Sequence, residues 1–161
     1  DAKSFRVYFD GKEEDLAGAS ALWGRIQDGR LGFSASDISL VVNLDQLGSS
    51  LSPLTKGNPD YLMMLSESAG CRRETLESVE KSQHVGLELA FDYYGSKDFT
   101  NLFYRKISDQ RIFLEHGIPS VMFTSGITML NNKPGDTPET LDYPVFTKRV
   151  RLIFHYLDRI L

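Results

Sequence analysis

The sequence is 161 residues long, with 41% hydrophobic and 25% charged residues and a net charge of -4. This length is enough to bury a hydrophobic core, and we expect a single domain over residues 1–161. The basic residues are scattered along the chain, which argues against nucleic-acid binding, and no apolar run reaches the ~18 residues of a membrane span. The one cysteine, Cys71, excludes an internal disulfide and a thiolate zinc site.

Strand and helix patterns alternate along the first third of the chain. Residues 5–9 predict a strand that starts without a lead-in, so we expect the rest of the domain to lie upstream in a longer protein. Apolar residues then recur at helical spacing from Leu16 to Ile26, and Asp28-Gly29 ends this helix. The β-branched run at 38–44 predicts a strand that is buried on both faces.

The middle of the chain continues this alternation, which predicts an α/β fold with a mostly parallel sheet flanked by helices. Gly117 is the expected C-cap of the helix before the last strand. The predicted elements are a loop at 48–60, a strand at 61–65, a helix at 72–83, a strand or helix at 87–94, an aromatic-rich loop or short helix at 95–107, a helix at 109–116 and a strand at 119–124.

The last helix is predicted from a start signal and an apolar stripe. Thr137-Pro138-Glu139 offers an N-cap, a proline at the first helical position and an acid in the first turn. We expect the apolar stripe to pack on the core; it consists of Phe146, Val150, Ile153, Leu157 and Ile160.

Two segments place carboxylates where an apolar run ends. They are Phe9-Asp10-Gly11-Lys12-Glu13-Glu14 and Val41-Val42-Asn43-Leu44-Asp45. Ligands of open α/β sheets bind outside the carboxyl ends of the strands. We therefore expect Glu13 and Asp45 to meet in one cleft, as half of a metal site or half of an acid/base pair.

These segments resemble the co-catalytic zinc aminopeptidase family, which includes glutamate carboxypeptidase and glutaminyl cyclase relatives. The resemblance implies the C-terminal portion of a zinc-exopeptidase-like domain, with further ligands supplied from upstream. It also implies two zinc ions that polarise the scissile carbonyl and generate hydroxide, a peptide substrate, and a periplasmic or extracellular location. The matching motifs are Phe-Asp-Gly-x-Glu with Leu-x-Gly, Asn-Leu-Asp-x-x-Gly, Ser-Asp with Gly-Ile-Pro, and Asp-Thr-Pro.

The resemblance assigns Asp45 as a zinc ligand and leaves two alignments open for the acidic pair. One alignment puts Lys12 at the general-base position and Glu13 at the ligand position. The other makes Glu13 the catalytic base and Glu14 a metal ligand. A lysine in place of the base is incompatible with that role, and its charge would repel zinc.

Two further family positions lack their usual histidine. Counting back from Asp136-Thr137, Asn132 stands where a zinc-binding histidine is expected, and Ser108-Asp109-Gln110 replaces a Ser-Asp-His triplet. By the same resemblance, Tyr104 and Asp109 are expected to face the substrate.

Two functions follow from these residues. The first is a zinc-dependent exopeptidase-like hydrolase with a degenerate metal site, inactive as this isolated chain. The second is a non-catalytic pseudopeptidase that binds peptides or a protein partner without metal. The residues also have plainer readings, since Asp45 or Asp109 can cap a helix or enter a loop, and Glu13 and Glu14 can be solvated acids near a helix dipole.

Overall fold

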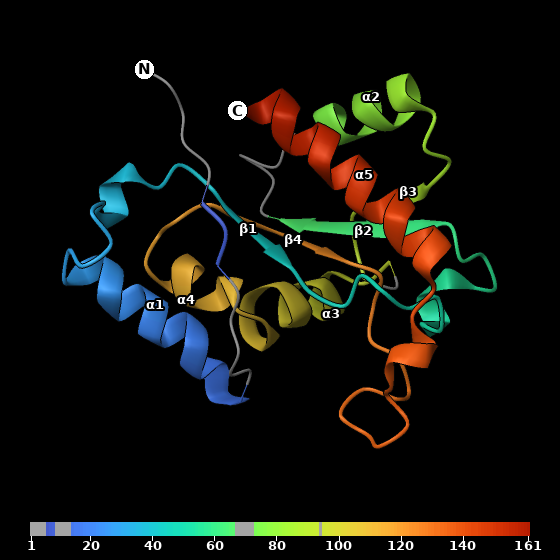
Figure 1. Cartoon of the computed structure of the whole chain (residues 1–161), viewed down its shortest axis with the longest axis horizontal. Helices are drawn as coiled ribbons and strands as arrows, with labels where there is room; N and C mark the ends of the chain where they lie inside the picture. The colour runs from blue at the N-terminus through green and yellow to red at the C-terminus, as the bar shows by residue number, and fades with distance from the viewer. Residues whose placement is uncertain (1–5, 9–13, 67–72, 94) are drawn as a thin grey trace.

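The computed structural model describes residues 6–8, 14–66, 73–93 and 95–161, apart from the side chain of Glu14. These residues form a sheet covered on one face by α2 and α5 and on the other by α1, α3 and α4 (Figure 1). The helices are α1 (Ala17–Gln27), α2 (Arg73–Gln83), α3 (Lys97–Leu102), α4 (Gln110–Glu115) and α5 (Tyr143–Ile160); the strands are β1 (Val41–Leu44), β2 (Tyr61–Ser66), β3 (Glu88–Ala90) and β4 (Ser120–Thr124).

The strands of the described residues lie in the order β1-β4-β2-β3. The pairs β1–β4 and β2–β3 are parallel, and β2–β4 is antiparallel. The predicted α/β fold with a mostly parallel sheet is therefore confirmed. The register sets Leu44 beside Phe123, and the Asp45 amide donates to the Phe123 carbonyl at 3.1 Å, so Asp45 lies just past the carboxyl end of β1.

The core divides along the alternation of the central strands. Leu62 and Met64 of β2 pack against α2 and α5, whereas Met63 and Leu65 pack on the opposite face with Tyr93. Because both faces of β2 are covered, its sequence is a continuous apolar run. The predicted helices and strands at 16–26, 61–65, 72–83, 109–116 and 119–124 match α1, β2, α2, α4 and β4 to within a few residues.

The first strand of the sheet is less buried than predicted. β1 is shorter than the run at 38–44, and Leu44 is 52% exposed. Within the described residues β1 pairs with β4 alone, so its other edge is open. The strand predicted at 5–9 is also absent where the structure describes it, since residues 6–8 have no regular structure. The segments at 87–94 and 95–107 become β3, α3 and a π-helical turn at Phe103–Ile107.

The last helix starts later than predicted, and four residues of its predicted apolar stripe pack on the core, namely Phe146, Ile153, Leu157 and Ile160. Thr137-Pro138 begins only a 3₁₀ turn at Pro138–Thr140, and Asp142 caps α5 by accepting from the Val145 amide at 3.2 Å. Val150, which was predicted to be buried, is 47% exposed. The residues of α5 that are buried are Val145, Arg149, Leu152, Ile153 and Tyr156.

The buried face of α5 includes a charged residue, Arg149. Its side chain is fully buried and donates to the carbonyls of Leu47 (2.6 Å), Ser49 (2.8 Å), Tyr61 (2.8 Å) and Pro59 (3.1 Å). Burial lowers the pKa of Arg149 to about 10, partly offset by nearby acidic groups, so the guanidinium remains charged at neutral pH. The cation therefore ties α5 to the segment that follows Asp45 and to the start of β2.

Candidate functional site

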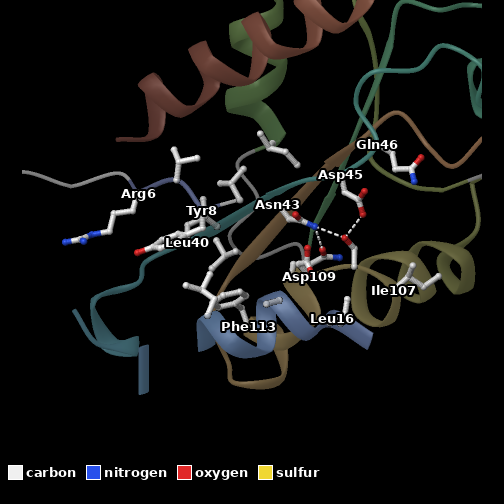
Figure 2. A pocket seen from close by; sticks show the side chains of 18 of the residues that line it. Arg6, Tyr8, Leu16, Leu40, Asn43, Asp45, Gln46, Ile107, Asp109 and Phe113 are labelled. Carbon is white, nitrogen blue, oxygen red and sulfur yellow. Dashed lines mark hydrogen bonds between the residues drawn. The ribbon is translucent and has the colours of Figure 1, made fainter. Parts of the chain in front are cut away.

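A groove of about 1270 Å³ runs along the open edge of β1. One end is apolar, with walls from α1, β1 and the last turn of α5 (Figure 2). The other end is polar and lies beyond the carboxyl end of β1. Its side chains are Asn43, Asp45, Gln46, Ser108, Asp109, Asn131, Asn132 and Asp136.

Asn43 and Asp45 reach the polar end from the same side of β1. They are two residues apart, and side chains at this spacing share a face of a strand. Figure 2 shows both directed toward the segment that contains Asp109. Asp45 Oδ2 accepts from Ser108 Oγ at 2.6 Å, and Asn43 Nδ2 donates to Ser108 Oγ at 2.7 Å.

The direction of these hydrogen bonds is set by a backbone carbonyl. Gln110 Nε2 donates to the Tyr104 carbonyl at 2.6 Å, which turns Gln110 Oε1 toward Asn43. Asn43 must then present its amide nitrogen, which donates to Gln110 Oε1 at 2.7 Å and to Ser108 Oγ. Ser108 consequently accepts from Asn43 and donates its own proton to Asp45. The network holds the carboxylate in place with one oxygen, Oδ2, engaged by the protein.

Gln110 therefore has a different role from the one that its sequence position suggested. It was interpreted only as the loss of an imidazole from a Ser-Asp-His triplet. In the structure it is fully buried, and its amide joins Asn43 to the backbone of Tyr104. A buried amide in this position orients the site by hydrogen bonding, and it is closed to solvent.

A second polar bridge fixes the far wall of the groove. Gln46 Nε2 donates to Asn131 Oδ1 at 2.6 Å and so ties the end of β1 to the loop after β4. Both Gln46 (φ 61°) and Asn132 (φ 57°) adopt left-handed backbone conformations. Asn132 is exposed and lines the groove, so this loop carries it to the polar end.

Three of the predicted site residues lie in this groove, namely Asp45, Asp109 and Asn132. Tyr104 does not fit its predicted substrate-facing role, because it is 3% exposed and its hydroxyl donates to the Ser120 carbonyl at 2.6 Å. Lys12 and Glu13 lie outside the described residues, as does the side chain of Glu14. The predicted meeting of Glu13 with Asp45 thus stays a prediction.

The described residues do not make up a zinc site by themselves. Among them, no group of three or more His, Cys, Asp or Glu side chains is placed to hold a metal ion. Asp45 is a suitable carboxylate ligand, but Asn132 offers only an amide oxygen where zinc favours imidazole. Any zinc site here depends on donors beyond the described part of the chain.

Two contributors to the site were missed in the sequence. Asn43 was interpreted only as part of a motif, and no hydrogen-bonding role was predicted for its side chain. Its spacing of two residues from Asp45 could have indicated that both side chains lie on one face of the strand. The contact from Ser108 had no local signal, since Ser108 and Asp45 are 63 residues apart. They meet because α4, which begins two residues after Ser108, packs against β1.

Residues 4–157 match Peptidase family M28, and the chain belongs to this family. No curated protein sequence matches the chain. None of the helices in the described ranges is long and apolar enough to cross a membrane.

Solved structures of aminopeptidases share the fold. The LapA aminopeptidase of Legionella pneumophila is similar with a TM-score of 0.62 and 13% identity, over 88% of this chain and 34% of that one. The zinc aminopeptidase BSAP of Bacillus subtilis gives 0.61 and 18%, over 90% and 32%. The aminopeptidase of Aneurinibacillus sp. strain AM-1 gives 0.57 and 19%, over 91% and 30%. The chain thus spans about a third of the length of these proteins.

Proposed function

We propose that residues 1–161 are one portion of a zinc-dependent, aminopeptidase-type hydrolase domain, and that the groove along β1 binds the peptide. The observation that carries this proposal is the hydrogen-bond network through Gln110, Asn43 and Ser108 that fixes Asp45 at the carboxyl end of β1. A carboxylate held this way at a strand end, in a chain of family M28, supports the ligand role that the resemblance of the Asn-Leu-Asp motif implies for Asp45.

The charge and shape of the groove support a peptide ligand. Its polar end carries the carboxylates of Asp45, Asp109 and Asp136, which attract the ammonium group of a free peptide N-terminus. Its apolar walls suit aliphatic or aromatic side chains, and the open edge of β1 offers backbone groups to an extended chain. A periplasmic or extracellular location, suggested by the family resemblance, belongs to the same proposal.

We propose further that the metal site is degenerate and that the isolated chain is inactive. The described donors do not fill a zinc coordination sphere, so no catalytic step through zinc is assigned to them. The replacement of imidazole by Asn132, and the burial of Gln110 in the fold, favour the alternative of a pseudopeptidase that binds peptide or a protein partner.

Metal content and hydrolysis separate the two functions. In the enzyme, the protein that contains this chain holds about two zinc equivalents, as a two-metal site requires, and hydrolyses an aminoacyl-anilide. Metal-free protein that leaves this substrate intact supports the pseudopeptidase and overturns the enzyme.

Peptide binding tests the groove in either case. The isolated chain is titrated with a dipeptide amide and followed by NMR. The Asp45→Asn variant should weaken binding several-fold, whereas Asp158→Asn, on an exposed position of α5, should leave it unchanged. Equal binding by both variants would show that the peptide does not use the polar end of the groove.

A further inference from the structure

One buried tyrosine connects two segments that form the polar end of the groove. These segments are residues 107–110 and the loop after β4, which contributes Asn131 and Asn132. Tyr93 follows β3, which lies at the opposite edge of the sheet from β1. Its side chain is 3% exposed and packs in the cluster that contains Met63 and Leu65 of β2. Tyr93 does not line the groove, so it can act there only through the residues that it contacts.

The hydroxyl of Tyr93 holds the start of the loop after β4. Ile127 donates its backbone N–H to the Tyr93 hydroxyl oxygen at 2.9 Å. Four residues further along the loop, Asn131 accepts from Gln46 Nε2 at 2.6 Å. The stretch of loop that leads to Asn132 is therefore fixed at two points, and the phenol of Tyr93 is one of them.

The ring of Tyr93 holds the segment on the other side of the polar end. It stacks on the ring of Phe103, with the ring centroids 4.0 Å apart and the ring planes within 6° of each other. Phe103 begins the π-helical turn, and Ser108, which donates to Asp45, follows this turn directly. Stacked aromatic pairs contribute more than the area that they bury, so the stack favours one position of the turn relative to Tyr93.

The backbone of Tyr93 is also fixed. Its N–H donates to Thr100 Oγ1 at 2.8 Å, and its carbonyl accepts from the Ser96 amide at 3.1 Å. A phenylalanine would fill the same apolar space and keep the stack, but it has no acceptor for the Ile127 amide. The hydroxyl therefore adds to core packing a defined contact with the loop.

We propose that Tyr93 is a positioning residue that sets the loop after β4 and the π-helical turn relative to each other. The hydroxyl places the loop that carries Asn131 and Asn132, and the ring places the turn that leads to Ser108. The consequence for peptide binding rests on the proposed function of the groove. The consequence for the two segments does not depend on that function.

Amide exchange in the protein that contains this chain tests the hydroxyl contact. Tyr93→Phe keeps the ring and removes the acceptor, so residues 127–132 should exchange about fivefold faster, as expected for one lost hydrogen bond. Exchange in β2 and β4 should stay as in the wild type. The matched control is Tyr143→Phe, at an exposed position of α5, and it should change neither region. Unchanged exchange at 127–132 in Tyr93→Phe, or an equal acceleration in β2 and β4, overturns the positioning role.

The coupling between the two segments is tested from the side of the turn. Phe103→Leu leaves the hydroxyl in place but removes the stack, so the ring of Tyr93 can shift and exchange should rise at both 105–110 and 127–132. Phe154→Leu, at an exposed position of α5, is the matched control and should alter neither segment. Faster exchange at 105–110 alone would show that the segments move independently, which overturns the coupling.

Peptide affinity relates the positioning role to the proposed function. In a calorimetric titration with a dipeptide amide, Tyr93→Phe should bind several-fold more weakly than the wild type, and Tyr143→Phe should bind equally well. If the wild type binds and Tyr93→Phe binds with the same Kd, the role of Tyr93 in the groove is overturned. If the wild type does not bind, the proposed peptide function fails instead, and the exchange measurements decide the positioning role by themselves.

Discussion

The buried guanidinium of Arg149 gives the sharpest test of how the fold supports the candidate site. Arg149→Met keeps an unbranched apolar stem and removes all four hydrogen bonds to backbone carbonyls. The Ser49 carbonyl would retain a hydrogen bond from Ser125, and the Pro59 carbonyl one from the Tyr61 amide. The Leu47 carbonyl, in contrast, has Arg149 as its hydrogen-bond donor.

The expected loss of stability follows from these bonds. An orphaned buried carbonyl costs about 1–3 kcal/mol, and each lost bond from a charged donor adds to this. Removing a desolvated cation returns part of the cost, so we expect Arg149→Met to lower the free energy of unfolding by about 2–4 kcal/mol. Arg149→Lys should lose at least as much, because it keeps a buried charge but lacks the planar fork that reaches several carbonyls.

Urea unfolding measures this loss, with the fluorescence of Trp23, the one tryptophan of the chain, as the probe. Arg159→Met, on an exposed position of the same helix, is the matched control and should stay within about 0.5 kcal/mol of the wild type. Amide exchange should also speed up in residues 47–49, directly after Asp45. An Arg149→Met protein as stable as the control would refute the role assigned to the four carbonyl contacts.

Three further predictions concern single residues. Gly126 has φ +91°, and an added Cβ would lie 2.5 Å from Ser52 Oγ, so Gly126→Ala should lower the free energy of unfolding by about 1–3 kcal/mol. Gly24 lies in open space on α1, so Gly24→Ala should raise it by about 0.5–1 kcal/mol. Equal shifts of the two variants in thermal or urea unfolding would contradict this reasoning. Gln110→Glu should destabilise the fold more at pH 8 than at pH 5. The introduced carboxylate would face the Tyr104 carbonyl, and only the protonated acid can donate a hydrogen bond there. The folded state therefore raises the pKa of this acid, and the variant gains stability as pH falls. A loss of stability that is independent of pH would refute the assigned orientation of the Gln110 amide. Hydrogen bonds from the Ser34 amide and then its hydroxyl hold the pKa of Asp37 below its ordinary value, so this carboxylate stabilises the fold above its unfolded pKa and loses that effect as pH falls. Ser34→Ala removes only the hydroxyl and should raise the pKa of Asp37 partway in an NMR titration, whereas an unchanged value would show that the hydroxyl bond is absent in solution.

Elements with a strong local pattern were predictable from the sequence. β2 and β4 are continuous apolar runs with polar or proline boundaries, and α1 repeats apolar residues at helical spacing up to Asp28-Gly29. The same reasoning placed Asp45 at the end of a strand, and the structure has it just past the carboxyl end of β1. These predictions succeed because each depends on residues that are neighbours in the chain.

The face that α5 turns inward depended on distant partners. Val150 is as apolar as its neighbours, and a charged Arg149 would ordinarily be assigned to solvent. Arg149 is buried because four carbonyls from residues 47–61 converge on it, about a hundred positions earlier in the chain. No local pattern reports such a convergence.

The sequence by itself determined the α/β class, the order of the main elements and the strand-end position of Asp45, because hydrophobic periodicity and turn residues act over short stretches of chain. Which side chains form hydrogen bonds with one another was decided by the tertiary structure alone. Ser108 binds Asp45, Gln110 binds Asn43, and Arg149 binds the backbone of the segment after Asp45. Within the described ranges the tertiary structure also leaves one edge of β1 unpaired. These outcomes depend on hydrogen bonds and packing between segments that meet only when the chain is folded.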